Sequence, residues 1–124
     1  RGIVADVVGA VVSELHDQGV GRLRSVLGPA ICGHCYSVPF ERCEQIMDTC
    51  PPDVTEAAIK RMSSGWGIDV GAAVQARLAM LGAEVDFVAG CSFESDRWFS
   101  LRRAVTMFGP NAATGRQALA LVIE

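Results

Sequence analysis

Two helix-length stretches with apolar residues at every third or fourth position most constrain what this chain can fold into. The first stretch covers residues 3–18 and stops at Gly19, and the second covers Val70–Leu81 and stops at Gly82. Asp69 precedes the second stretch, where its carboxylate can accept hydrogen bonds from the free N–H groups of a first helical turn. The spacing predicts two amphipathic helices, each of which must bury one face against another element.

Short runs of branched and aromatic residues alternate with the helical stretches. They predict strands at Leu23–Leu27, Val85–Ala89, Trp98–Leu101 and Ala118–Ile123. Pro39 can open a further helix over residues 40–47, because proline is tolerated in a first turn, and Pro51-Pro52 ends it. Residues 53–64 indicate a short helix followed by a loop, and Met107–Gly115 indicates a loop. Interleaved helices and strands of this kind predict one layered α/β or α+β domain.

The composition is that of one globular domain, and it argues against several classes of partner. Of the 124 residues, 50% are hydrophobic and 20% are charged, which suffices for a core. The formal net charge of -3 gives no electrostatic reason to expect nucleic acid or an anionic membrane as a partner. No apolar run approaches the roughly 20 residues of a membrane-spanning helix. The oligomeric state is left open by the sequence.

The first residues suggest that the chain belongs to something longer. Arg1 takes the place of an initiator methionine, and the apolar Ile3 and Val4 follow almost at once. A natural amino terminus is usually more polar and less ordered. We therefore expect residues 1–124 to be part of a larger single domain that continues upstream of Arg1.

The five cysteines are Cys32, Cys35, Cys43, Cys50 and Cys91. Their odd number, without a secretory signal before them, favours reduced thiols in a cytoplasmic protein over a disulfide framework. We expect Cys43, Cys50 and Cys91 to be small buried hydrophobic side chains.

The tetrapeptide Cys32–Cys35, Cys-Gly-His-Cys, is typical of thiol–disulfide oxidoreductases. That chemistry needs the first thiol at a helix amino terminus, where the macrodipole lowers its pKa. Pro39 disfavours helical geometry at Val38, and Ile31 replaces the aromatic residue expected before the first cysteine. The same residues could ligate zinc, but a second Cys/His pair at matching spacing is absent from the sequence. Both interpretations are therefore weaker than a structural role.

Arginines and one glycine-containing turn are the candidates for binding a ligand. The turn consists of Gly28, Pro29, Ala30 and Ile31. Its small side chains would let a ligand approach backbone N–H groups at the end of a strand. Arg102 and Arg103 would point to opposite faces of their predicted strand, and Arg116 opens the last strand. Guanidinium groups suit phosphate and carboxylate ligands, although a solvated strand end would look the same.

Taken in order, these segments resemble the laccase-domain (YfiH-type) family. Leu27–Ile31 followed by Cys35–Val38 resembles its "LGPAIG…CYEV" segment, and residues 66–81 resemble its "hlDL…A…QL…lGV" segment. Cys91-Ser92 followed by residues 97–103 resembles "CT…FFSYRR". The match is completed by Thr114-Gly115-Arg116, which resembles the closing "TGR", and by Arg1-Gly2, which would end the "HAGWRG" motif.

The chain also departs from the family pattern. Cys32-Gly33 replaces the usual Gly-Pro, and His34 stands where cysteine is frequent. Leu101 occupies a position where tyrosine is common, and Met107–Ala113 resembles a short insertion before the closing motif. These changes leave the inferred fold intact and bear on the fine substrate preference.

The resemblance implies a purine nucleoside phosphorylase with an α+β fold of mixed sheets and flanking helices, similar to the catalytic domain of a bacterial toxin deamidase. Family members phosphorolyse adenosine, inosine, guanosine and methylthioadenosine with inorganic phosphate, and they deaminate adenosine. Their zinc is held by two histidines and one cysteine. The resemblance places all three upstream of Arg1, so residues 1–124, the C-terminal part of the domain, would carry no metal ligand and would be inactive alone.

The resemblance also assigns roles to the candidate residues, with no catalytic residue among them. The residues expected to contact the substrate are Gly28, Pro29, Ala30, Ile31, Arg102, Arg103 and Arg116. Arg1, Cys35 and Tyr36 are expected to support these residues without contacting the substrate. Two alternatives are a copper-dependent polyphenol oxidase, the older name of the family, and a peptidoglycan editing factor. Copper centres of that kind need many histidines, and this chain has only His16 and His34. A thiol–disulfide oxidoreductase is the last alternative.

Overall fold

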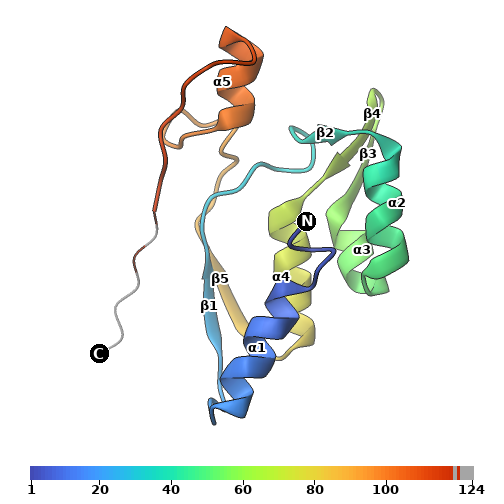
Figure 1. Ribbon diagram of the computed structural model, residues 1–124, viewed down its shortest axis with the longest axis vertical. Coiled ribbons are helices and arrows are strands. Elements are labelled where there is room, and N and C mark those ends of the chain that lie inside the picture. Colours follow the sequence, from blue (N-terminus) through green and yellow to red (C-terminus); the bar gives the residue numbers. More distant parts are fainter. Residues whose placement is uncertain (119, 121–124) are drawn as a thin grey trace.

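Helices and short strands alternate along the computed structural model, which describes residues 1–118 and 120 (Figure 1). The helices are α1 (Val7–Asp17), α2 (Phe40–Thr49), α3 (Pro52–Ala58), α4 (Val70–Met80) and α5 (Leu101–Phe108). The strands are β1 (Arg24–Leu27), β2 (Ser37–Val38), β3 (Ile59–Met62), β4 (Gly65–Ile68) and β5 (Glu84–Phe87). None of the helices in the described part has the length and apolar character that crossing a bilayer demands.

The strands form two small sheets of different kinds. β1 pairs with β5 in parallel, with Arg24 opposite Glu84 and Leu27 opposite Phe87. The other sheet is antiparallel and has the order β2-β4-β3. Parallel and antiparallel pairing therefore occur together with helices in one layered structure, which confirms the predicted α+β class.

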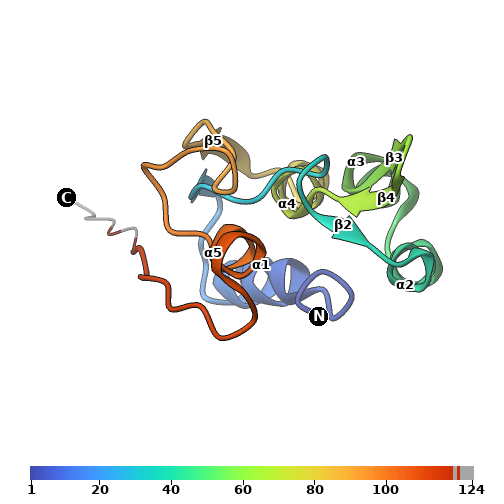
Figure 2. The same cartoon turned by 90° about the horizontal axis from the view of Figure 1, so that it is seen from above.

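Helix α4 lies between the two sheets (Figures 1 and 2) and contacts α1, α3, β1 and β5. Its buried Ala73 joins a core cluster with Ile46 of α2 and Val54 of α3. Its buried Leu78 joins a second cluster with Val12 of α1 and Ala83. Burial of apolar surface is the dominant favourable contribution to folding, so α4 is the element that holds both halves together.

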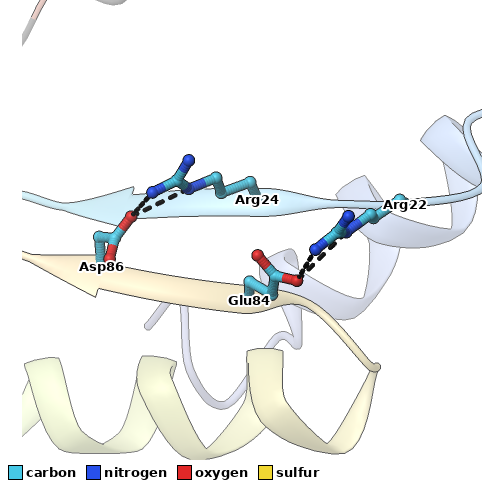
Figure 3. Close-up of polar contacts among 4 residues, drawn as sticks. All are labelled: Arg22, Arg24, Glu84 and Asp86. Atoms are coloured by element: carbon cyan, nitrogen blue, oxygen red, sulfur yellow. Dashed lines mark hydrogen bonds and ion pairs between the residues drawn. The ribbon is translucent and has the colours of Figure 1, made fainter.

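Ion pairs cover the outer face of the parallel pair (Figure 3). Arg22 binds Glu84, and Arg24 binds Asp86 with an Nη2–Oδ2 distance of 2.9 Å. Residues two apart share a strand face, so the intervening Leu23 turns to the opposite face, where it packs with the second core cluster. Because all four charged side chains are exposed, each pair contributes only about 0–1 kcal/mol to the free energy of unfolding. The pairs therefore favour the register of β1 against β5 more than they stabilise the fold.

One loop crosses the antiparallel sheet very closely. A Cβ added at Gly67 of β4 would overlap the carbonyl oxygen of Gly33, and a Cβ at Gly33 would overlap the side chain of Lys60. The N–H of Gly33 donates to the Asp69 carboxylate at 3.2 Å, and the other Asp69 oxygen accepts from the N–H of Ala72 at 2.9 Å. Asp69 therefore caps α4, as predicted, and also anchors the loop that contains the Cys-Gly-His-Cys tetrapeptide.

The first helix begins later than its apolar spacing predicts. Residues 2–6 form turns, and Asp6 has a positive φ of 45° and caps α1, which begins at Val7. A side-chain cap ends the helix toward its amino terminus, because it satisfies N–H groups that another helical turn would use. The predicted end is confirmed: α1 finishes at Asp17, and Gly19 has a φ of 89°.

The region after α3 holds a hairpin that the sequence did not indicate. The loop expected at the end of residues 53–64 is wrong, because β3 begins at Ile59 and pairs with β4. Each strand has four residues, and Gly65 of β4 has a φ of 135°. Strands this short carry too little alternation to be recognised without their partner.

The strand predicted at Trp98–Leu101 is wrong. Ser100 caps a helix there, with its Oγ accepting from the N–H of Arg103 at 3.3 Å, and α5 runs from Leu101. The aromatic residues before Ser100 suggested a strand, but a serine cap outweighs their β propensity. The predicted loop Met107–Gly115 starts only after Phe108, and most of the strand predicted at Ala118–Ile123 lies outside the described residues.

We expect Asp69→Ala to lower the free energy of unfolding by about 1–2 kcal/mol, because it removes the cap of α4 and the anchor of Gly33. Urea denaturation followed by circular dichroism measures this loss. Asp69→Asn is the matched control, since it keeps a side-chain oxygen at the cap and should lose much less. Equal losses in the two variants would contradict the capping role.

Asp6 and Arg77 tie α1 to α4, with Nε–Oδ1 and Nη2–Oδ2 distances of 2.8 and 2.6 Å. The hydrogen bonds from Arg77 lower the pKa of Asp6 below its ordinary value of 3.8. A lowered pKa contributes stability above the ordinary pKa, and this contribution is lost as the pH falls through the lowered one.

We therefore expect Asp6→Asn to cost about 0.5–1 kcal/mol at pH 7, because asparagine tolerates the left-handed backbone but lacks the charge. The difference between wild type and variant should shrink between pH 4 and pH 2. Urea titrations at several pH values measure it, and a difference that is constant over this range would show that the ion pair is unimportant.

Candidate functional site

A cleft of about 450 Å³ is lined by three arginines from separate parts of the chain. Arg1 comes from the N-terminal segment, Arg42 from the first turn of α2, and Arg102 from the start of α5. Tyr36, just before β2, contributes an aromatic ring, and apolar side chains such as Ile68 line another part of the wall. The cleft thus combines cationic groups with an apolar surface.

Arg102 and Tyr36 lie against each other in this cleft. The guanidinium carbon of Arg102 is 5.0 Å from the centroid of the Tyr36 ring, within the range of a cation–π interaction. Backbone hydrogen bonds hold Tyr36: its N–H donates to Cys32, and its carbonyl accepts from Ile68 of β4 at 3.1 Å. The ring therefore provides a fixed platform for the guanidinium group of Arg102.

The electrostatics of this cleft favour an anion. None of the described residues that line it is acidic, so the positive charges of Arg1, Arg42 and Arg102 are not neutralised within the cleft. Guanidinium groups present several N–H donors in a planar fork that matches phosphate and carboxylate oxygens. These guanidinium groups could therefore bind a phosphate or carboxylate group.

Arg103 has a different task from its neighbour. Its guanidinium group donates to backbone carbonyls of the preceding loop, including Ser92 at 2.9 Å, Phe93 at 3.1 Å and Trp98 at 2.6 Å. The expectation that Arg102 and Arg103 sit on opposite faces of a strand is wrong, because both lie on α5. Arg102 lines the cleft, whereas Arg103 fastens the loop between β5 and α5.

The Gly28–Ile31 turn lies apart from the arginine cleft. Gly28, Ala30 and Ile31 line a second cleft of about 300 Å³, together with residues of α4 and the end of β5, and Pro29 is not part of its lining. Arg116 is exposed and lines neither cleft. The structure therefore brings Arg1, Tyr36 and Arg102 together and leaves the glycine turn and Arg116 elsewhere.

Arg42 was missed by sequence reasoning. It stands one turn into the helix predicted after Pro39, and nothing in the local pattern distinguishes it from a solvent-exposed residue of an amphipathic helix. Its closeness in sequence to Tyr36 was the available signal, because a short strand connecting to a helix keeps both near one end of the sheet.

A second group of polar side chains lies where the loops after β1 and β5 meet. The donor atoms of Cys32, Cys35, Cys91 and Glu94 all lie within 4.8 Å of one another, and the three cysteines are free. The Cys35 thiol donates to Glu94 Oε1 at 3.3 Å, and Cys91 Sγ accepts from the N–H of Cys32 at 3.3 Å. This Cys/Glu cluster is compatible with a metal ion.

Within the Cys/Glu cluster, the pKa values of Cys35 and Cys91 are shifted in opposite directions. Burial raises the pKa of Cys35, and the neighbouring Cys32 and Glu94 raise it further, because negative charge would accumulate there. Burial also acts to raise the pKa of Cys91, but backbone N–H groups of Cys32, Glu94 and Phe93 outweigh it and lower this pKa. Backbone N–H groups therefore stabilise the ionised form of Cys91.

From the sequence, Cys91 is expected to be a buried hydrophobic residue, and Cys32 and Cys35 have no second Cys/His pair at matching spacing. Cys91 is indeed buried, but it faces both thiols. No helix begins at Cys32: the segment 33–35 is a turn closed by the Cys35 N–H and the Cys32 carbonyl at 3.1 Å. The helix dipole that activates the first thiol of an oxidoreductase is thus missing.

The metal centre that the laccase-domain resemblance implies has no counterpart among the residues that the structure describes. His16, on α1, and His34, in the loop after β1, are both exposed. Within residues 1–118 and 120, the one group of three or more possible ligands is the Cys/Glu cluster, which contains no histidine. A centre of two histidines and one cysteine does not fit the described residues, so no chemical step is assigned to it.

The sequence model of one protein family, described as multi-copper polyphenol oxidoreductase laccase, matches residues 1–124. The chain belongs to this family. Two curated relatives, both named purine nucleoside phosphorylase, come from Streptomyces griseus and Streptomyces coelicolor, with 35% and 37% identity over 108 residues. The aligned part is 82% of this chain but only 41% and 42% of these relatives. No solved structure gives a significant match.

We expect Arg103→Lys to speed amide hydrogen exchange across residues 92–98 by roughly tenfold or more. An ammonium group cannot reach all the carbonyls that the guanidinium group binds, and each lost charged hydrogen bond costs about 1.5–3 kcal/mol. Hydrogen exchange with mass spectrometry measures the change. Arg102→Lys is the matched control on the same helix and should leave this loop unaffected. Equal protection in both variants would contradict the role of Arg103.

Proposed function

We propose that this chain forms part of a purine nucleoside phosphorylase and that its arginine cleft binds inorganic phosphate. The observation that carries the proposal is the convergence of Arg1, Arg42 and Arg102 on a cleft with no acidic residue in its described lining. The names of the two Streptomyces relatives support it, since a phosphorylase needs such an anion site beside its nucleoside. Purine nucleosides and phosphate are thus the proposed substrates.

The reaction assigned to this cleft is a displacement at the ribose. A phosphate oxygen forms a bond to C1′ while the bond from C1′ to the purine nitrogen breaks. The purine leaves with the electron pair and takes up a proton, so that ribose 1-phosphate and the free base are formed. Arg102 and its neighbours would orient the phosphate and offset its charge, and positioning of this kind supplies much of the rate of such reactions.

Several finer features belong to the proposal for the intact protein. They are zinc dependence, phosphorolysis of methylthioadenosine, deamination of adenosine and a cytoplasmic location. Residues 1–124 would be the C-terminal part of the domain. The Gly28–Ile31 turn and its cleft of about 300 Å³ lie beside the Cys/Glu cluster and are proposed to contact the nucleoside rather than the phosphate.

We expect Arg102→Ala, made in the full-length protein, to raise the KM for phosphate roughly 10- to 100-fold, because a charged hydrogen bond contributes about 1.5–3 kcal/mol. The KM for inosine should change much less. Release of hypoxanthine from inosine at varied phosphate concentrations measures both constants. Arg97→Ala is the matched control, since Arg97 stacks on Trp98 outside the cleft and should leave both constants unchanged.

An unchanged KM for phosphate in Arg102→Ala would show that this cleft is not the phosphate site. Copper-dependent oxidation of a phenol by the full-length protein, without any phosphate-dependent release of hypoxanthine, would overturn the proposed function itself. These two results are distinct, because the first removes only the assignment of the cleft.

A further inference from the structure

We propose that Cys32, Cys35, Cys91 and Glu94 form a structural zinc site that joins the loop after β1 to the loop after β5. The proposal is independent of the proposed function, because it concerns how these loops are held rather than what the arginine cleft binds. The proposed site also differs from the two-histidine, one-cysteine centre that the family resemblance implies. It contains no histidine, and all its ligands lie within residues 32–94 of this chain.

The four ligands come from two turns with the same spacing. Cys32 and Cys35 flank two residues, and so do Cys91 and Glu94. The first turn is closed by the N–H of Cys35 on the Cys32 carbonyl at 3.1 Å, and the second by the N–H of Ser95 on the Cys91 carbonyl at 3.0 Å. Two ligands separated by two residues on a tight turn are the usual unit of structural zinc sites.

The fold brings these turns together by strand pairing rather than by the cysteines. β1 and β5 are parallel, and a bridge between Ala30 and Cys91 extends their alignment into the loops. The N–H of Ser92 donates to the Ala30 carbonyl at 3.0 Å. Thiols that lie 59 positions apart therefore meet at the carboxyl end of a parallel strand pair, so the site is organised before a metal binds.

The distances are close to those that zinc requires. The donor atoms lie within 4.8 Å of one another, and Cys35 Sγ is 3.3 Å from Glu94 Oε1. Tetrahedral zinc with bonds of about 2.3 Å to sulfur separates its sulfur ligands by about 3.8 Å. Small side-chain rotations that contract the widest separation by about 1 Å suffice to complete the coordination.

The surroundings of Cys91 stabilise its ionised sulfur. Cys91 is buried and accepts a hydrogen bond from the N–H of Cys32, which is the contact that thiolate ligands receive in metal sites. Arg103 binds the carbonyls of Ser92 and Phe93, so its positive charge lies beside the second turn. Three thiolates and a carboxylate around a divalent ion leave two negative charges, which this guanidinium group partly offsets.

The donor set points to zinc and to a structural role. Thiolates favour zinc or Cu(I), and the oxygen of Glu94 favours the borderline zinc ion over the softer copper. Four protein ligands leave no open position for water or substrate, which is the pattern of structural rather than catalytic zinc. Cys32 stands where the motif that this segment resembles has glycine.

The test measures metal content in the full-length protein. Zinc per chain is determined by plasma mass spectrometry for wild type, Cys32→Gly, Cys91→Ser and Glu94→Gln, each purified with reductant. We expect Cys32→Gly and Cys91→Ser to lose about one zinc ion per chain relative to wild type. Cys50→Ser is the matched control, because Cys50 is a half-buried thiol of another core cluster, and it should retain the wild-type content.

Cobalt replacement gives a second measurement that does not depend on activity. Protein reconstituted with Co²⁺ should show thiolate-to-cobalt charge-transfer absorption, which falls in Cys32→Gly and persists in Cys50→Ser. If Cys91→Ser fails to fold, zinc content is compared in Cys32→Gly and Glu94→Gln. Glu94 is exposed, so Glu94→Gln should fold, and it should bind zinc more weakly than wild type. Unchanged zinc content in Cys32→Gly would overturn the proposal.

Discussion

The parallel pairing of β1 with β5 is the constraint on which the rest of the structure depends. It joins segments about 60 residues apart in the chain, and the loops that follow the two strands contain every ligand of the Cys/Glu cluster. The exposed ion pairs on its outer face contribute little, whereas Leu27 and Val85 pack on the cluster of Val12 and Leu78 beneath. Apolar burial of β1 and β5 against α4 therefore positions the loops that contain the Cys/Glu cluster.

The two candidate sites are coupled through the chain itself. Cys35 belongs to the Cys/Glu cluster. The next residue, Tyr36, makes a cation–π contact with Arg102 in the arginine cleft. Arg102 and Arg103 are also neighbours, with one in the cleft and the other binding the turn that holds Cys91 and Glu94. A metal ion that fixed the two loops would consequently restrict the positions of both cleft residues, without touching the bound anion.

Local signals predicted the helices whose ends are marked by capping or helix-breaking residues. Asp69 and Gly82 bound α4, Pro39 opens α2, and Gly19 follows α1, because caps and helix stops act within a few residues. The β3–β4 hairpin was missed, since four-residue strands show no alternation that distinguishes them from loops. Trp98–Leu101 was mistaken for a strand, because its aromatic residues outweighed the serine cap in a reading by propensity. The interleaving of elements nevertheless predicted a layered α/β or α+β domain, and the family resemblance implied the mixed sheets.

By itself, the sequence determined the family, the bounds of α4, the end of α1 and the residue types available for chemistry, because these depend on local pattern and on motif order. Only the tertiary structure decided which of those residues act together. It separated Arg102 from Arg103, added Arg42 to the cleft and placed Cys91 and Glu94 beside Cys32 and Cys35. The physical reason is that ligands of one site are brought together by strand pairing and core burial between distant segments, and no local spacing records those contacts.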